Sequence, residues 1–301
     1  MKFVCYQEFE DPQEPVLPGI FRNGKVLPLA RAVAVAEALA PKGVSVPSDL
    51  NDVMARMKSY AGAVRDLEKA RVLDKLWMEA GAFLLAPLPA PRRILAIGRN
   101  YSEHAKELGG EVPDEPIVFQ KASSSVIASE QPIVLPQGIG RVDYEGELAI
   151  VIVSPGKNVP ENEALSLVAG YTLINDVTAR DVQKRAIGKS LPWFLSKSYD
   201  TFGPLGPCIV TPDEIPDPQN LELTLRVNDE IKQQANTSEM LFSIPALIAY
   251  LSRHLALMPG DVIATGTPSG VGPLKPGDRV EVRIDQIGTL ANPVVGEDEV
   301  F

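Results

Sequence analysis

The pattern of hydrophobic and polar positions divides the chain into two parts, one with helical spacing of apolar residues and one with short apolar runs. From residue 61 to 81, the stretch AGAVRDLEKARVLDKLWMEAG has apolar residues at helical spacing, which predicts one amphipathic helix. The apolar positions of this helix are Val64, Leu67, Val72, Leu73 and Leu76. Earlier in the chain, Asn23 and Gly24 separate two short apolar pairs, and this dipeptide is typical of a two-residue hairpin of type I′.

Beyond the proline-rich stretch APLPAPRR, residues 86–93, short apolar runs alternate with Pro, Gly and Asp, which predicts strands. These runs are Ile94–Ile97, Ile133–Leu135, Leu148–Val153, Ala169–Ile174, Leu221–Val227, Val262–Ala264 and Val280–Ile284. One helix is expected after Asp176 and another in SIPALIAYLSRHLAL, with Ser243 as its N-cap. We therefore expect an α+β protein that is mainly β, with a small N-terminal α+β domain at 1–88 and a second domain at 89–301.

Charge and cysteine content narrow the class of protein. The formal net charge of −10 argues against a nucleic-acid partner and against an anionic membrane surface, since both need an excess of Lys and Arg. Cys5 and Cys208 have no metal-site or redox spacing. The N-terminus lacks the apolar region of a signal peptide, and no apolar run reaches membrane-spanning length. A cytoplasmic protein is the simplest expectation.

Two glutamates stand at the start of the buried-type strand DYEGELAIVIV. Side chains alternate along a strand, so Glu145 and Glu147 are predicted to project from the same face. Two carboxylates this close repel each other unless a positive charge lies between them. Either the strand starts in water and both are solvated, or they bind a hard divalent cation such as Mg²⁺.

Other segments offer further polar groups, each with two interpretations. Asp176 ends an apolar strand, where it is either a third carboxylate ligand or the N-cap of the next helix. His104 and Glu107 are three residues apart, so a helical turn would let the carboxylate orient the imidazole as a base; an exposed polar helix is the alternative. Lys197 is either a substrate cation or a surface charge, whereas His254 near a helix end is expected to be structural.

The loop ATGTPSGVG, residues 264–272, lacks the Lys-Ser/Thr ending of a phosphate-binding P-loop. Its backbone amides and the hydroxyls of Thr265 and Thr267 can still bind a carboxylate; a tight turn is the alternative.

The order of these segments decides between the alternatives. GRNYSEHAKE, DYEGELAIVI, GYTLINDVTARDVQ, KSYDTFGPLGP and PGDVIATGTPSGVG together resemble the fumarylacetoacetate hydrolase superfamily, in its branch of acylpyruvate hydrolases and 2-hydroxyhepta-2,4-diene-1,7-dioate isomerases. The resemblance runs from about Ile94 to the C-terminus. It implies a catalytic domain with the family's mixed β-roll, usually as a homodimer. The family often has FLKP where this chain has FQKA, residues 119–122.

The resemblance also implies roles for nine residues. Glu145, Glu147 and Asp176 match the family's metal ligands, which hold Mg²⁺ or Mn²⁺, with Ca²⁺ as a further option. The remaining matches are the His–Glu pair of a lid segment, the lysine of the K-x-x-D-T motif, a polar residue facing the substrate, the TGTP threonine that binds a substrate carboxylate, and an arginine that can reach an anion. They fall on His104, Glu107, Lys197, Gln183, Thr267 and Arg99.

The reaction implied is metal-dependent hydrolysis of a C–C bond in a small 1,3-diketo acid of the acylpyruvate or fumarylpyruvate type, through an enolate stabilised by the metal. His104 is the expected base for the water, and Lys197 is expected to stabilise negative charge. An isomerase or decarboxylase of 2-oxo acids, such as oxaloacetate, is the alternative reaction, in the setting of aromatic compound catabolism. A metal-binding domain without catalysis is the alternative of another class.

Overall fold

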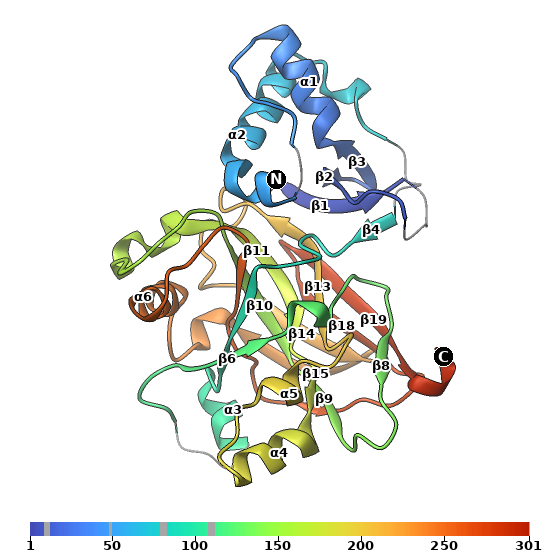
Figure 1. Cartoon of the computed structure of the whole chain (residues 1–301), viewed down its shortest axis with the longest axis vertical. Coiled ribbons are helices and arrows are strands. Elements are labelled where there is room, and N and C mark those ends of the chain that lie inside the picture. The colour runs from blue at the N-terminus through green and yellow to red at the C-terminus, as the bar shows by residue number, and fades with distance from the viewer. Residues whose placement is uncertain (9–12, 48–49, 79–82, 108–111, 301) are drawn as a thin grey trace.

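The computed structural model describes residues 1–8, 13–47, 50–78, 83–107 and 112–300. Strands outnumber helices, and the two helices α1 and α2 cover one end of the molecule while α3, α4 and α5 gather at the opposite end (Figure 1). The mixed, mainly β fold class expected from the sequence is confirmed.

The N-terminal segment is a small α+β unit, as expected. Its elements are β1 (Lys2–Gln7), β2 (Leu17–Arg22), β3 (Lys25–Pro28), α1 (Leu29–Leu39), α2 (Leu50–Lys69), the short 3₁₀ turn Leu73–Lys75 and β4 (Phe83–Leu85). The hairpin between β2 and β3 is confirmed, because Asn23 and Gly24 both have positive φ, at 52° and 77°, which a type I′ turn requires.

The predicted helix at 61–81 is wrong in its second half. Helix α2 contains Val64 and Leu67, both buried, but it ends at Lys69. Arg71 has φ 58°, which takes the backbone out of the helix. Leu73 is nevertheless buried, through the 3₁₀ turn that follows, so tertiary packing rather than helix continuation explains its apolar character. Residues 79–81 of the prediction lie outside the described residues.

An eleven-stranded sheet runs through both parts of the chain, in the order β3-β2-β1-β13-β11-β10-β16-β5-β6 with β4 and β7 attached at the side. Its further strands are β5 (Arg93–Gly98), β6 (Ile117–Lys121), β7 (Val126–Ile127), β10 (Gly146–Ile152), β11 (Val168–Asn175), β13 (Gly203–Val210) and β16 (Asp261–Ala264). Because β1 pairs with β13, the N-terminal segment extends the sheet of the second part. The domain boundary at 88/89 stays a prediction.

A five-stranded sheet packs against the large one. It has the order β15-β14-β18-β19-β8, formed by β8 (Ile133–Leu135), β14 (Glu222–Val227), β15 (Glu230–Asn236), β18 (Arg279–Ile284) and β19 (Gly288–Gly296). A three-stranded sheet joins β12 (Thr178–Ala179), β9 (Val142–Tyr144) and β17 (Gly272–Pro273). All seven apolar runs expected to be strands lie wholly or largely in strands of these sheets.

Gly146 marks the close approach of the two large sheets. A Cβ atom at this position would lie 3.0 Å from Cδ1 of Leu225 and 3.1 Å from Cγ1 of Val282, both in the five-stranded sheet. The absence of a side chain therefore lets the start of β10 pack directly on the second sheet.

The helices of the second part are α3 (Ser102–Glu107), α4 (Arg180–Gly188), α5 (Phe194–Lys197) and α6 (Ile244–His254). The N-cap of α6 is confirmed, since Oγ of Ser243 accepts a hydrogen bond from the backbone N–H of Ala246. His254 ends this helix with its ring against Tyr250, in keeping with a structural role. Among the described residues, no helix combines the length and apolar character needed to cross a membrane.

Candidate active site

Three buried carboxylates converge where β10 and β11 meet. The two strands are antiparallel, and Gly146 lies opposite Asn175, so the flanking Glu145 and Asp176 become neighbours. The backbone N–H of Asp176 donates to the carbonyl of Glu145 at 2.8 Å. One oxygen from each of Glu145, Glu147 and Asp176 falls within 4.8 Å of the others. The convergence expected of the three carboxylates is thus present.

Both alternatives without a metal are wrong for these carboxylates. Glu145 and Glu147 are only 4% and 1% exposed, so the strand does not start in water. Asp176 is not a helix N-cap, because Thr178–Ala179 first pairs with β9 and α4 begins only at Arg180.

The three carboxylates suit a hard divalent cation. Burial raises the pKa of Glu147 well above its ordinary value, and the charges of Asp176 and Glu145 add to this effect. Oδ1 of Asp176 is buried without a hydrogen bond of good geometry, although Nζ of Lys121 lies 2.9 Å away. Three buried carboxylates whose oxygens converge match the donor set that Mg²⁺, Mn²⁺ and Ca²⁺ prefer.

Two buried lysines border this cluster. Nζ of Lys197 donates to Oε2 of Glu145 at 2.6 Å and to Oδ2 of Asp176 at 2.5 Å. Lys121 donates to the backbone carbonyls of Lys197 and Val177 in addition to its ion pair with Asp176. Lys197 is therefore in the site, as expected, and it touches two of the predicted ligands directly.

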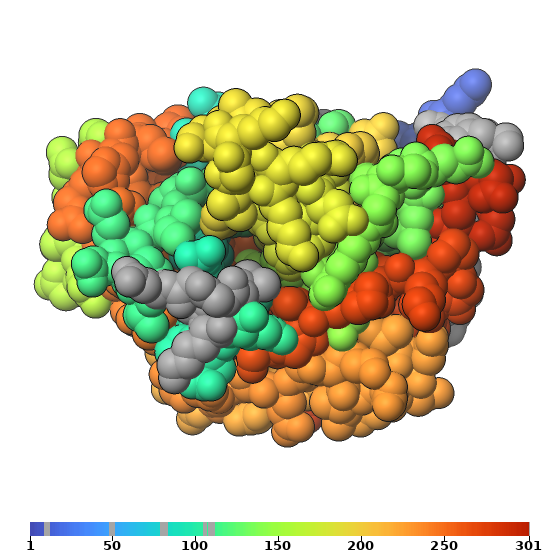
Figure 2. All heavy atoms as spheres, turned by 90° about the horizontal axis from the view of Figure 1, so that it is seen from below, coloured from blue at the N-terminus to red at the C-terminus, as the bar shows by residue number. Residues whose placement is uncertain are grey.

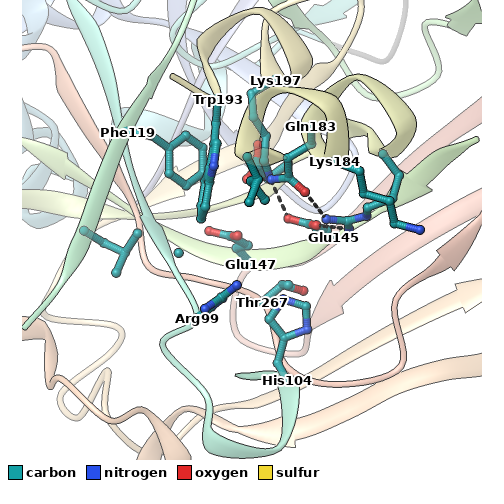
Figure 3. Close-up of a pocket in the computed structure, with 15 residues that line it drawn as sticks. Arg99, His104, Phe119, Glu145, Glu147, Gln183, Lys184, Trp193, Lys197 and Thr267 are labelled. Atoms are coloured by element: carbon teal, nitrogen blue, oxygen red, sulfur yellow. Dashed lines mark hydrogen bonds and ion pairs between the residues drawn. The ribbon is translucent and has the colours of Figure 1, made fainter. Parts of the chain in front are cut away.

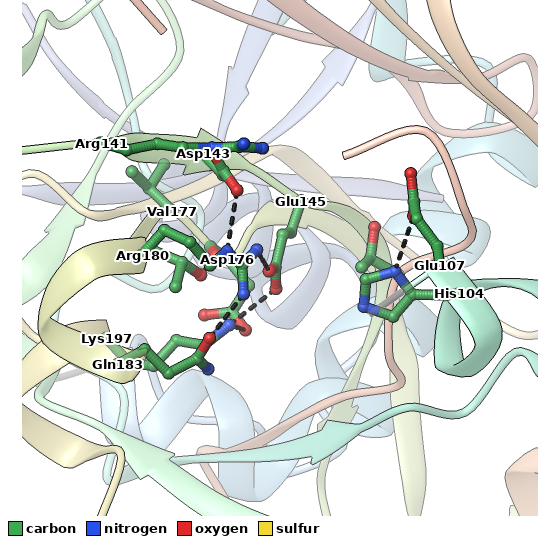
Figure 4. Close-up of polar contacts among 12 residues, drawn as sticks. His104, Glu107, Arg141, Asp143, Glu145, Asp176, Val177, Arg180, Gln183 and Lys197 are labelled. Atoms are coloured by element: carbon green, nitrogen blue, oxygen red, sulfur yellow. Dashed lines mark hydrogen bonds and ion pairs between the residues drawn. The ribbon is translucent and has the colours of Figure 1, made fainter. Parts of the chain in front are cut away.

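Lys197 contacts one carboxylate oxygen of Glu145, and Arg180 contacts the other (Figure 4). The guanidinium of Arg180 donates to Glu145, to Oδ2 of Asp143 at 2.8 Å, and to Oε1 of Gln183 at 2.5 Å. Burial opposes the ionisation of Glu145, but Lys197 and Arg180 outweigh it and lower the pKa of Glu145 below its ordinary value. Gln183 thus lies in the site, with its carbonyl oxygen directed toward Arg180.

His104 and Glu107 form the expected pair on α3. Nδ1 of His104 lies 3.3 Å from Oε2 of Glu107, and His104 is 3% exposed, so the exposed-helix alternative is wrong for the histidine. Burial lowers the pKa of His104, and the opposing effect of the carboxylates of Glu145 and Glu107 offsets this lowering only in part. A neutral imidazole with Nδ1 directed to a carboxylate leaves Nε2 for proton transfer. Glu107 also accepts a hydrogen bond from the backbone N–H of Gly270, which ties α3 to the TGTP loop.

The TGTP loop runs along the start of β10. Oγ1 of Thr265 donates to the carbonyl of Leu148 at 2.8 Å, and the N–H of Gly266 donates to Oε2 of Glu147 at 2.7 Å. Oγ1 of Thr267 donates to the carbonyl of Gly146 at 3.0 Å. The two threonine hydroxyls, which were expected to bind a substrate carboxylate, therefore donate their hydrogen bonds to backbone carbonyls of the protein itself. Thr267 nevertheless lines the cavity.

All nine residues expected in the site except Glu107 line one cavity of about 620 Å³, counted with its open mouth. Seen from below, the surface is hollowed between the segment of α4 and α5 and that of α3 (Figure 2). Phe119 and Trp193 form an aromatic wall with ring centroids 5.4 Å apart, and Arg99 and His104 lie across the cavity from it (Figure 3). Arg99 has φ 57°, a conformation that is rare for non-glycine residues. Where it does occur, it is often at a functional site.

Sequence reasoning missed several polar residues of the site. Lys121, Arg180 and Asp143 lie in the segments FQKA, TARD and DYEG, yet no role was assigned to them. Buried carboxylates need nearby cations, so the Lys and Arg in these same segments were the available signal. Gln233 comes from β15, and nothing in its local sequence points to the site.

Comparison with known proteins now defines the class. Residues 93–295 match the family model described as fumarylacetoacetate (FAA) hydrolase C-terminal, which is more than half of the chain. The chain belongs to this family, as its motifs predicted.

Individual relatives span several reactions. A mitochondrial oxaloacetate tautomerase from Xenopus laevis is 48% identical over 219 residues, covering 70% of this chain and 68% of the relative. A maleylpyruvate hydrolase from Sphingobium sp. SYK-6, solved with manganese(II) and pyruvate, is 30% identical with a TM-score of 0.78, covering 98% of this chain and 99% of that one. A 2-hydroxyhepta-2,4-diene-1,7-dioate isomerase from Mycobacterium marinum is 32% identical with a TM-score of 0.74, covering 99% of each chain. Family membership supports an enzyme, and the individual residue roles and the homodimer stay predictions.

Proposed function

We propose that the protein is a divalent-metal-dependent hydrolase that cleaves a C–C bond in a small 1,3-diketo acid of the acylpyruvate type. The observation that carries this proposal is the combination, in one cavity, of three converging carboxylates with a buried His104 whose Nδ1 faces Glu107. Glu145, Glu147 and Asp176 would hold Mg²⁺ or Mn²⁺, which supplies Lewis acidity to adjacent carboxylate and carbonyl oxygens of a 2-oxo acid.

The protein's own groups then have distinct tasks. Nε2 of His104 takes a proton from the water that adds to the carbonyl carbon furthest from the substrate carboxylate. Cleavage of the bond between that carbon and the neighbouring CH₂ leaves its electron pair on the departing fragment as an enolate. The proton held by His104 then returns to that CH₂ carbon, so that a carboxylic acid and a 2-oxo acid are released. Lys197 and Arg99 provide positive charge at the cavity for the anionic substrate, and the wall of Phe119 and Trp193 excludes water from one side.

A second candidate is an isomerase or decarboxylase of 2-oxo acids. The 48% identity to an oxaloacetate tautomerase favours it, and keto–enol exchange needs the same metal-binding carboxylates and a base such as His104, without attack by water. Both reactions remove or deliver a proton beside a carbonyl group, so the residues alone do not separate them.

A substrate panel separates the candidates. Acetylpyruvate, fumarylpyruvate, oxaloacetate and 2-hydroxyhepta-2,4-dienedioate are each incubated with the protein and Mg²⁺ or Mn²⁺, and with EDTA, and products are followed by NMR. We expect cleavage of an acylpyruvate that stops on chelation and returns with metal. Oxaloacetate tautomerisation without any cleavage would replace the first candidate by the second. Turnover that survives thorough chelation would exclude the metal from both, and no turnover of any substrate would favour a non-catalytic metal-binding domain.

A further inference from the structure

We propose that Gln233 is a positioning residue, which fixes the backbone between two predicted metal ligands against the TGTP loop and thereby sets metal affinity. This inference rests on the proposed metal-dependent function. Gln233 lies on β15 in the five-stranded sheet, outside the five segments on which the resemblance to the family was based. It is 1% exposed, whereas its neighbours Lys232 and Gln234 are exposed.

All three polar groups of the Gln233 amide bind the site. Oε1 accepts from the backbone N–H of Gly146 at 3.0 Å, and Nε2 donates to Oγ1 of Thr267 and to the carbonyl of Pro268, each at 2.8 Å. If the amide were flipped, its NH₂ group would face the N–H of Gly146, and its oxygen would face the carbonyl of Pro268. Neither pair can form a hydrogen bond, so these partners define the orientation of the amide. A buried amide with every group paired is held rigidly, because each broken bond would leave a polar atom unsatisfied.

These bonds close a ring with the loop. Oγ1 of Thr267, which accepts from Gln233, itself donates to the carbonyl of Gly146 at 3.0 Å. Gly146 is therefore held by its N–H and its carbonyl at once, and the side chains of Leu225 and Val282 leave no room for a Cβ atom at this position. Neighbouring Glu147 is tied to the same loop through the N–H of Gly266.

The ring bears on metal binding because Gly146 separates Glu145 from Glu147. The two ligand side chains leave the backbone on either side of a residue whose position Gln233 fixes. Loss of the amide leaves the N–H of Gly146 without this partner and lets strand and loop shift relative to each other. Groups that orient metal ligands in this way typically change metal affinity by about 10- to 100-fold when removed.

The test measures binding of Mn²⁺ alone, by isothermal titration calorimetry on the full chain without substrate. For Gln233→Ala we expect the Kd for Mn²⁺ to rise about tenfold or more. Asn292→Ala is the matched control. Asn292 is also 1% exposed in the five-stranded sheet, and its Nδ2 donates to the carbonyls of Ala128 and Gln131, neither of which lines the cavity. This control should lose thermal stability but keep the Kd of the parent.

A Gln233→Ala protein whose Kd stays within about twofold of the parent, with a loss of stability like that of Asn292→Ala, would show a purely structural role and overturn the inference. Gln233→Asn keeps a buried amide that is too short to reach all three partners, and it is judged by the same criterion if the alanine variant does not fold. Since no substrate is present, a parent that binds Mn²⁺ but turns over no 2-oxo acid contradicts the proposed reaction only. A parent that binds no Mn²⁺ overturns both.

Discussion

Nζ of Lys197 lies 2.6 Å from Oε2 of Glu145, and both side chains are buried. The same ammonium group contacts Asp176, so one lysine touches two of the three predicted metal ligands. Asp176 and Glu145 hold the pKa of Lys197 above its ordinary value despite the opposing effect of burial, so the lysine is charged at neutral pH. A permanent cation beside the ligands repels a metal ion as well as attracting a substrate anion.

Replacing Lys197 should therefore separate metal affinity from turnover. In Lys197→Met we expect the Kd for Mg²⁺ to stay equal or fall, because a like charge has been removed, while kcat falls about 100-fold or more with the loss of charge stabilisation. Calorimetry and steady-state kinetics measure the two effects, with the exposed Lys157→Met as control. A tenfold weaker binding of Mg²⁺ would instead show that Lys197 is needed to hold the ligands in place.

The pH dependence of activity should report the lowered pKa of His104. A general base is active when neutral, so kcat/KM should fall on the acid side with a limb below the ordinary histidine value of about 6.5. Glu107 raises this pKa, so Glu107→Gln should lower the rate and move the limb to still lower pH. An acid limb above pH 6.5, or one that persists in His104→Ala, would contradict the assignment.

The same shift predicts a direction for stability. Because the folded pKa of His104 lies below the unfolded one, the unfolded chain binds more protons between the two values. The neutral histidine's contribution is complete above the unfolded pKa and is lost as pH falls through the window below about 6.5. Urea unfolding of the parent and of His104→Gln across this window should show the smaller pH dependence in the variant.

Replacing glycine by alanine should change the stability of the fold in opposite directions at Gly146 and at Gly62. At Gly146 a Cβ atom meets Leu225 and Val282 at 3.0 and 3.1 Å, so Gly146→Ala should cost roughly 1–3 kcal/mol and weaken metal binding by moving the flanking glutamates. At Gly62, inside α2, a Cβ atom has no neighbour within 4 Å, so Gly62→Ala should stabilise by roughly 0.5–1 kcal/mol. Thermal unfolding measures both, and a stabilised Gly146→Ala would disprove the close packing.

Removing the N-terminal segment tests the predicted boundary at 88/89. A chain that starts at residue 89 would lose the pairing of Phe3 with Ile209 on β13, and it would remove Phe3 and Ile20 from the buried apolar cluster to which Ile209 belongs. We expect a lower Tm and aggregation in size-exclusion chromatography, because the free edge of β13 can pair with other chains. A truncated chain that is monodisperse with the Tm of the full chain would establish 89–301 as an independent domain.

Much of this architecture was readable from local sequence. The turn at Asn23-Gly24 and the cap at Ser243 depend on residues within a few positions, and they were predicted correctly. The contact between His104 and Glu107 depends only on helical spacing. The convergence of the carboxylates is different, since it depends on which strands pair, and there only the resemblance of ordered motifs supplied the answer.

What the sequence did not reveal depends on contacts between distant segments. The helix predicted over residues 61–81 ends at Lys69, because packing and the positive φ of Arg71 override its periodicity. Arg180 reaches across 35 residues to Glu145, and Gln233 reaches across 87 residues to Gly146. A buried polar residue shows no periodic pattern that marks its partner, so these roles emerge only when the sheets are assembled.

Trp193 gives the cavity its own spectroscopic signal. The chain has two tryptophans, and the other, Trp77, stacks with Arg22 in the N-terminal segment, away from the cavity. In a Trp77→Phe background the remaining indole sits in the cavity wall beside Phe119, where its emission depends on the polarity and quenching groups around it. The protein therefore carries a native fluorophore at the candidate site, and ligand binding in this cavity should change its emission, so that occupancy can be followed without a label.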